Sequence, residues 1–323
     1  MSVTVEQKQS QPTSMTPAQP NEWTRDRINK VAWRVFLYAL LFIGAVVISL
    51  PWTWMILSSL KTNVELHTVP VPFFPAEPQW GNYYTAFFLE TGGGMRAGQV
   101  SLESFWPKLI RNTLIIAFFV EIGILLSSAL VAFGFSRLRW RGRNLLFFLV
   151  LATMMLPAQV TLIPQYLIFT KVFGWTNTWY PQIVPAFFGA AWAIFLLRQF
   201  MMTIPVEIDE AARLDGCNDF QLFWRIILPM AKPALGAIAI FTFGYVWNDL
   251  FTPLLYIRDF ENLGNVATGL SAMRNMGSLW GERFPRDELT MAAAAMMSVP
   301  LVILFFVFQK QYIQGVVITG VKG

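Results

Sequence analysis

An unbroken apolar run from residue 35 to residue 57 constrains this chain more than any other feature, because it contains no charged side chain. A helix of that length rises far enough, at about 1.5 Å per residue, to cross a hydrocarbon layer of roughly 30 Å. Within lipid the backbone must satisfy its own hydrogen bonds, which favours helices. Five more apolar segments follow, at residues 112–135, 145–168, 182–200, 234–256 and 291–308. We therefore expect an all-α integral membrane protein with six transmembrane helices.

The composition agrees with a membrane location. Hydrophobic residues make up 55% of the chain and charged residues 13%, whereas about 25% of the residues in soluble domains are charged. The single cysteine, Cys217, cannot form a disulfide within the chain, so nothing implies an oxidising compartment. The single histidine, His67, leaves no cluster of histidines and cysteines for a metal ion. We therefore expect no metal site.

Four arginines between residues 136 and 143 set the expected orientation, because short cytoplasmic loops carry an excess of Lys and Arg. With this loop inside the cell, the N- and C-termini are both cytoplasmic. Lys and Arg then number 15 in the inner segments and 9 in the outer ones. The same bias accounts for the net charge of +5, without nucleic acid as a partner.

The segments between the spans divide the chain further. Residues 1–34 form a cytoplasmic tail, and its Gln, Ser, Thr and Pro content predicts that it is largely disordered. Residues 58–107 form an external loop segment with a triple glycine at 92–94, which no Lys-Ser/Thr pair follows as in a phosphate loop. Residues 108–309 hold the other five spans, and residues 310–323 form a second cytoplasmic tail.

Residues 204–229 are unusually polar for a segment between two apolar spans. Pro205 suits the first turn of a helix, where its missing N–H leaves no bond unmade. Glu207 and Asp209 follow where the helix dipole favours negative charge. Gly216 can adopt the left-handed conformation that ends a helix. The pattern predicts a helix and a glycine turn outside the lipid.

A second helix is expected after the glycine. Asn218 or Asp219 can cap its N-terminus, and Pro229 marks its end. Aromatic and aliphatic side chains then recur at helical spacing, at Phe220, Phe223, Trp224 and Ile227.

The motif Glu210-Ala211-Ala212, followed by Gly216 and later by Ile226-x-Leu228-Pro229, resembles the EAA loop of binding-protein-dependent ABC importer permeases. The similarity covers the chain well from residue 109 onward and more loosely over residues 36–83. Further matches place the chain in the carbohydrate branch, similar to the second permease subunit of maltose-type systems; they are Leu197-Arg198-Gln199-Phe200, Trp247-Asn248-Asp249 and Val321-Lys322-Gly323. One departure is Cys217, where the family usually has alanine.

The resemblance implies a type I ABC importer permease fold, in which the EAA loop, here residues 201–233, is a coupling helix that docks on a cytoplasmic ATPase. The residues expected to make this contact are Glu207, Glu210, Ala211, Ala212, Asp215 and Gly216. The chain has no phosphate loop, so it is not expected to be an enzyme by itself. ATP and Mg²⁺ belong to the partner ATPase, and no cofactor is expected in this chain.

The resemblance also implies an assembly in a prokaryotic inner membrane. A second permease subunit, two ATPase subunits and an extracytoplasmic sugar-binding protein would together import a sugar or oligosaccharide by alternating access. The alternative is an ion-coupled secondary transporter or a channel, with Glu121 and Asp249 as cation sites. That alternative leaves the EAA loop unexplained.

Polar residues inside the spans are candidates for the substrate pathway, because a carboxylate in lipid is unfavourable and should face a cavity or a partner. Glu121, Asn248 and Asp249 are such residues, with helix–helix hydrogen bonding as the other interpretation of each. Arg198 is expected to reach the inner interface as an anchor. In the C-terminal tail, the resemblance implies that Gly320 and Lys322 approach the ATPase dimer.

Overall fold

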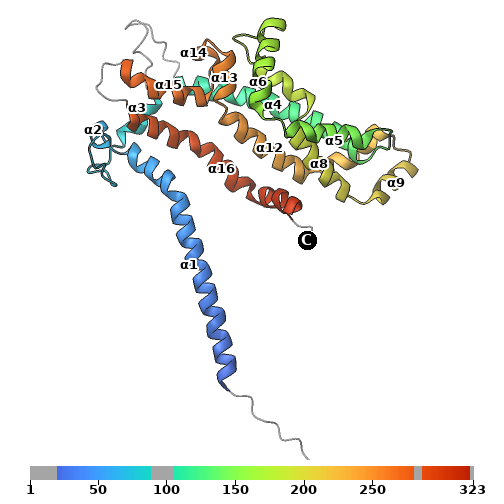
Figure 1. Ribbon diagram of the computed structural model, residues 1–323, viewed down its shortest axis with the longest axis horizontal. Helices are drawn as coiled ribbons and strands as arrows, with labels where there is room; N and C mark the ends of the chain where they lie inside the picture. Colours follow the sequence, from blue (N-terminus) through green and yellow to red (C-terminus); the bar gives the residue numbers. More distant parts are fainter. Residues whose placement is uncertain (1–19, 89–104, 280–285, 321–323) are drawn as a thin grey trace, which may run out of the picture. The chain divides into compact units, whose positions relative to one another are not determined.

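The computed structural model describes residues 20–88, 105–279 and 286–320, and within these ranges the chain forms helices and no strands (Figure 1). Four helices are long and apolar enough to cross a membrane, at Arg27–Ser59, Trp106–Ser136, Tyr180–Thr203 and Asp287–Gln309. Two bent pairs of helices raise the number of spans to six if each pair counts as one. The expected all-α membrane fold is therefore confirmed.

The first part of the chain, Met1–Trp54, forms a unit of its own, and most of the long helix α1 (Pro20–Ser59) lies in it. Residues 20–34 are helical, whereas residues 1–19, which hold most of the stretch expected to be disordered, lie outside the described part. Adding a residue to an existing helix is far easier than starting one. The helix of the apolar span therefore extends into its polar flank.

Short helices α2 (Asn63–Leu66) and α3 (Gly81–Phe87) interrupt the segment expected as an external loop. Thr62 and Glu65 form a reciprocal capping box at the start of α2. The indole of Trp106, fully buried, donates a hydrogen bond of 2.8 Å to the carbonyl of Ala86 in α3. This bond thus holds α3 against the first turn of the helix that begins at Phe105.

Helix α4 (Phe105–Ser136) packs against α8 (Ala191–Thr203) and α12 (Lys232–Trp247), and α12 packs against α16 (Asp287–Gly320) (Figure 1). Small side chains make these contacts close, as expected for packing in a membrane. Completely buried alanines mark the contacts, at Ala129, Ala132, Ala193, Ala237, Ala292 and Ala293. A Cβ on Gly123 of α4 would lie 3.0 Å from the backbone of Ala186, so a larger residue there would require Ala186 to shift.

The third span is broken where one helix was expected. Helix α5 (Arg143–Met154) ends before Pro157, which precedes α6 (Ala158–Leu167) and the π-helix η1 (Ile168–Val172), and the two halves bend by 97°. Proline lacks an N–H and disfavours the helical conformation in the residue before it. The proline therefore separates two half-spans.

The fifth span also ends earlier than expected, at Trp247 rather than residue 256. A new short helix, α13 (Phe251–Tyr256), follows, and the Asp249 carboxylate accepts a 3.0 Å hydrogen bond from the Thr252 N–H in its first turn. Helices also occupy residues expected as loops and as the second tail. They are α14 (Phe260–Leu263), α15 (Val266–Leu279) and the last part of α16. The fourth span, expected at residues 182–200, is made of α7 (Tyr180–Ile183), the 3₁₀ helix η2 (Val184–Phe188) and α8.

Candidate functional site

The first helix of the EAA loop is α9 (Val206–Leu214). Pro205 was expected in the first turn of this helix but is its N-cap, one position earlier. At the other end, Gly216 has a φ of +84°, which confirms the predicted left-handed residue. The Gly216 N–H donates to the carbonyl of Arg213 at 3.1 Å and the Cys217 N–H to that of Ala212 at 2.9 Å. These two bonds form a Schellman motif, which satisfies carbonyls at the helix end.

Asn218, rather than Asp219, caps the second helix. Its side-chain oxygen accepts a 2.8 Å bond from the Gln221 N–H, and its own N–H donates to the Gln221 side chain at 3.0 Å. Arg213 and Asp219 form an exposed ion pair of 2.6 Å across the turn. Local hydrogen bonds therefore fix the angle between the two helices.

The second helix is irregular. It consists of α10 (Asp219–Gln221), a π-helix η3 (Leu222–Ile227) and α11 (Leu228–Met230). Phe223 and Ile227 are buried, whereas Phe220 and Trp224 are exposed, with ring planes 6° apart and centroids separated by 6.4 Å. The aromatic side chains predicted at helical spacing therefore divide between two faces, and single π-helical turns of this kind often occur at functional sites.

The inner face of the EAA loop belongs to the largest apolar core of the described chain. Ala212 is only 4% exposed and lies in the same cluster as Phe223 and Ile227 of η3. The cluster continues to Leu197 of α8 and Phe133 of α4. The structure thus places Ala212 against the chain's own core rather than on a free surface.

The outer face carries the other predicted contact residues. Glu207, Glu210, Ala211, Asp215 and Gly216 are all exposed. Apolar side chains extend this face on both helices and include Val206 at 55%, Leu214 at 89%, Phe220 at 68% and Trp224 at 50% exposure. Exposed apolar and acidic groups side by side are typical of a protein-binding surface.

A buried ion pair lies beneath the loop and was not predicted from the sequence. The Arg137 guanidinium donates from Nη1 to Oδ2 of Asp209 at 3.2 Å, and the two side chains are 4% and 10% exposed. Arg137 Nη2 also donates to the carbonyls of Met201 and Ile204 at the end of α8. One signal was available: Asp209 lies three residues before Ala212 and therefore on the same helix face.

The intramembrane candidates each bind their own neighbours. Glu121 of α4 is half-buried, and its carboxyl lies against the backbone of Phe243 in α12. The Asp249 carboxylate, besides its bond from the Thr252 N–H, accepts a long 3.4 Å bond from the Gln182 side chain. The exposed Asn248 amide donates to the carbonyl of Gly244 at 2.8 Å. Asp249 thus holds helix ends together.

Two further expectations concern the cytoplasmic side. Arg198 was expected to extend to the interface, but its guanidinium lies 4.1 Å from the ring centre of Phe147 and donates to the Phe135 carbonyl at 3.3 Å. It therefore joins three helices near the end of α4. Gly320 is the last residue of α16, and Lys322 lies outside the described residues.

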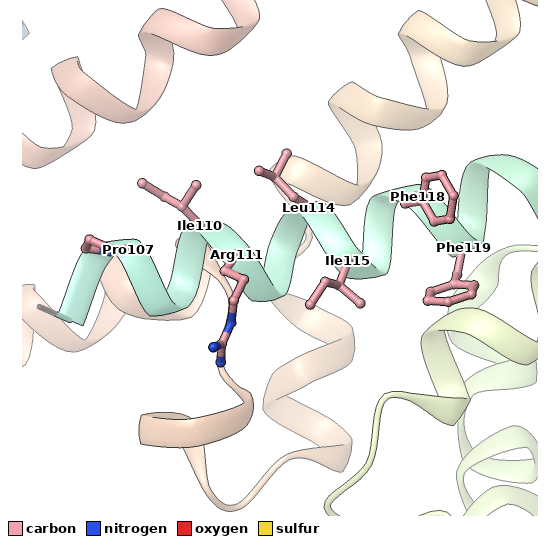
Figure 2. A pocket seen from close by; sticks show the side chains of 7 residues that line it. All are labelled: Pro107, Ile110, Arg111, Leu114, Ile115, Phe118 and Phe119. Carbon is pink, nitrogen blue, oxygen red and sulfur yellow. The ribbon is translucent and has the colours of Figure 1, made fainter. Parts of the chain in front are cut away.

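An open hollow of about 610 Å³ runs along the outside of α4 (Figure 2). Its lining comes from one helix and is apolar except for one arginine: Pro107, Ile110, Arg111, Leu114, Ile115, Phe118 and Phe119. In a membrane protein such a face is covered by lipid or by another helix. No residue predicted for the site lines it.

The model of the family "Binding-protein-dependent transport system inner membrane component" matches residues 122–317. The sn-glycerol-3-phosphate transport system permease protein UgpE of Salmonella typhi is 30% identical over 90% of this chain and 98% of its own length. The arabinooligosaccharides transport system permease protein AraQ of Bacillus subtilis is 29% identical over 83% of this chain and 89% of its own.

Two solved structures share the fold. A chain of a bacterial ABC transporter involved in the import of the acidic polysaccharide alginate superposes with a TM-score of 0.67, at 24% identity, and covers 91% of this chain and 99% of its own. A chain of the alginate ABC transporter in complex with a periplasmic protein that holds an alginate pentasaccharide gives a TM-score of 0.55, at 14% identity, with 88% and 94% covered.

Proposed function

The chain belongs to the family of binding-protein-dependent transport system inner membrane components, and from this we propose that it is a permease subunit of an ATP-driven importer for a sugar or oligosaccharide. The observation that carries the proposal is the outer face of the EAA loop, where acidic and apolar side chains are exposed on a turn of fixed geometry. A surface of this kind suits a groove on an ATPase. The similarity to AraQ, which is named for arabinooligosaccharides, supports the substrate class, whereas UgpE is named for glycerol phosphate, which is not a sugar.

The outer face offers two kinds of contact to the ATPase, charged and apolar. Glu207 and Glu210 offer carboxylates to basic groups of the ATPase, and Ala211 allows close approach. Leu214 inserts an apolar side chain, because it is the most exposed leucine of the loop. Ala212 and Gly216 act indirectly, the first by seating α9 on the core and the second by setting the turn.

The assembly contains a second permease subunit, two ATPase subunits that bind ATP and Mg²⁺, and an extracytoplasmic sugar-binding protein. The proposed location is the inner membrane of a bacterium, with both termini and the EAA loop in the cytoplasm. The arginines that follow α4 support this orientation through the positive-inside rule.

For the substrate pathway we favour Glu121 over the other candidates. Its carboxyl is half-buried between α4 and α12, where it can accept hydrogen bonds from sugar hydroxyls. Asp249 already binds Thr252 and Gln182, so it serves helix packing, and Asn248 lies beside it. Gly320 and Lys322 remain candidates for contact with the ATPase pair.

Transport in proteoliposomes tests the proposal. The complete complex, supplied with its sugar-loaded binding protein outside, should accumulate sugar only when ATP is present on the ATPase side. Protonophores should leave the initial rate unchanged. Uptake that ignores ATP and collapses with a protonophore would establish the ion-coupled alternative instead.

A further inference from the structure

We infer that Arg137 and Asp209 are a positioning pair that carries movement between the EAA loop and the ends of α4 and α8. The inference rests on the proposed function, because it concerns how ATPase movement reaches the spans. Neither residue belongs to the outer face, and neither would touch ATP or sugar. Their role is to transmit a displacement in a defined direction.

Arg137 connects three elements with one side chain. It is the first residue after α4, and its guanidinium contacts Asp209 in α9 at 3.2 Å. The same guanidinium donates to the carbonyls of Met201 and Ile204, the second at 2.8 Å. A planar guanidinium can serve several acceptors at once, whereas a lysine ammonium presents a single point of charge. The geometry therefore requires arginine.

Burial makes the connection directional. The two side chains are only 4% and 10% exposed, so a displaced Asp209 would leave a charge without water or a partner. The apolar contacts of Ala212, by contrast, are non-directional and allow sliding. A movement of α9 must therefore take Arg137 with it, or break a buried ion pair.

The pair also has the means to exist in two arrangements. Arg137 Nε and Asp209 Oδ1 are both buried and make no hydrogen bond to any residue in the described part of the chain. Buried polar atoms normally have partners. Rotation of either side chain would let these atoms form a hydrogen bond and would break one of the present contacts. A hydrogen-bond network with two arrangements suits an element that switches between two conformations.

The test compares Arg137→Lys with the native protein in the complete complex, reconstituted in nanodiscs with its ATPase and binding protein. We expect normal assembly, and a ratio of binding-protein-stimulated to basal ATP hydrolysis that falls about fivefold or more, the size of a typical coupling between sites. Sugar taken up per ATP, measured in proteoliposomes, should fall as well. Arg139→Lys is the matched control, because Arg139 is exposed in the same loop, and it should leave both values unchanged.

A second variant guards against loss of folding. Arg137→Gln combined with Asp209→Asn removes both charges and leaves no unpaired ion, and it should assemble with the same loss of stimulation. An unchanged stimulation ratio in an assembled variant overturns the inference, as does failure of both variants to assemble, which would mean that the pair only holds the fold. If the native complex itself shows no ATP-dependent uptake, the proposed function fails instead.

Discussion

Two neighbouring alanines, Ala211 and Ala212, belong to two regions of the EAA loop, one exposed and one buried. Ala211 is exposed, whereas Ala212 is 4% exposed and packs in the core with side chains of α4, α8 and η3. The outer region offers a surface, and the inner region connects that surface to the transmembrane helices. Two neighbouring residues of one motif thus lie on opposite faces of the loop.

This difference changes how mutations in the motif should be interpreted. A loss of transport after substitution of Ala211 reports on docking, because that side chain touches nothing essential within its own chain. The same loss after substitution of Ala212 reports on folding of the loop. The predictions below use matched variants on the two regions, beginning with the largest effect.

Ala212→Asp should produce the largest effect, because it places a carboxylate in an apolar core without a partner, at a cost of several kcal/mol. We expect a large drop in the unfolding temperature of the purified chain even when no ATPase is present. Ala211→Asp, one residue away, should change the free energy of unfolding by no more than about 0.5 kcal/mol. Equal losses in the two variants would contradict the division into two regions.

Leu214→Asp should leave folding intact and weaken ATPase binding. The side chain is 89% exposed, and burying a leucine in a partner's groove contributes about 1.5–3 kcal/mol. We expect an affinity for the ATPase lower by a factor of roughly 10 to 100, measured by titration of the ATPase onto the permease pair in nanodiscs. Unchanged affinity would place the docking surface elsewhere.

Gly216→Val tests the turn that joins the regions. A β-branched residue at a φ of +84° stores strain of about 1–3 kcal/mol. Space is not the limit, because an added Cβ would meet nothing within 4 Å. Gly216→Asn should therefore be tolerated, since asparagine adopts this conformation more readily. A valine variant as stable as the asparagine variant, in thermal unfolding, would refute the backbone explanation.

Asn218→Ala should have the smallest effect. It removes the acceptor for the Gln221 N–H and should lower stability by about 1 kcal/mol, as lost N-caps do. Asn218→Ser retains an acceptor and serves as the control in the same unfolding assay. If the alanine variant lost as much stability as Ala212→Asp, the cap would be part of the core connection rather than a local bond.

Local chemistry made part of the loop predictable. Gly216 and Asn218 act through backbone groups within a few residues, so residue type alone indicated the left-handed turn and limited the cap to Asn218 or Asp219. The EAA spacing likewise led to the family. The side of α9 that faces the core could not be read in this way, because it depends on where α4 and α8 lie.

Long-range structure accounts for what the sequence did not predict. Arg137 and Asp209 are 72 residues apart, and no periodicity within a segment relates them. Hydropathy alone does not show packing either: the spans Trp106–Ser136 and Asp287–Gln309 are similarly apolar, yet 33% and 22% of their apolar windows are buried. Pro157 was expected inside one continuous span. Whether the helix breaks there depends on how the neighbouring helices pack, which the sequence does not show.

The junction between the EAA loop and α12 has a mechanical consequence. The segment Asp219–Met230 meets Lys232–Trp247 at 72° and forms an arm of roughly 18 Å at 1.5 Å per residue. A sideways push of about 2 Å on its tip, the size of helix shifts at switching interfaces, turns the arm by about 6°. Ala231 at the junction is completely buried. If the loop docks on the ATPase as proposed, a small push on it would change the tilt of a transmembrane helix.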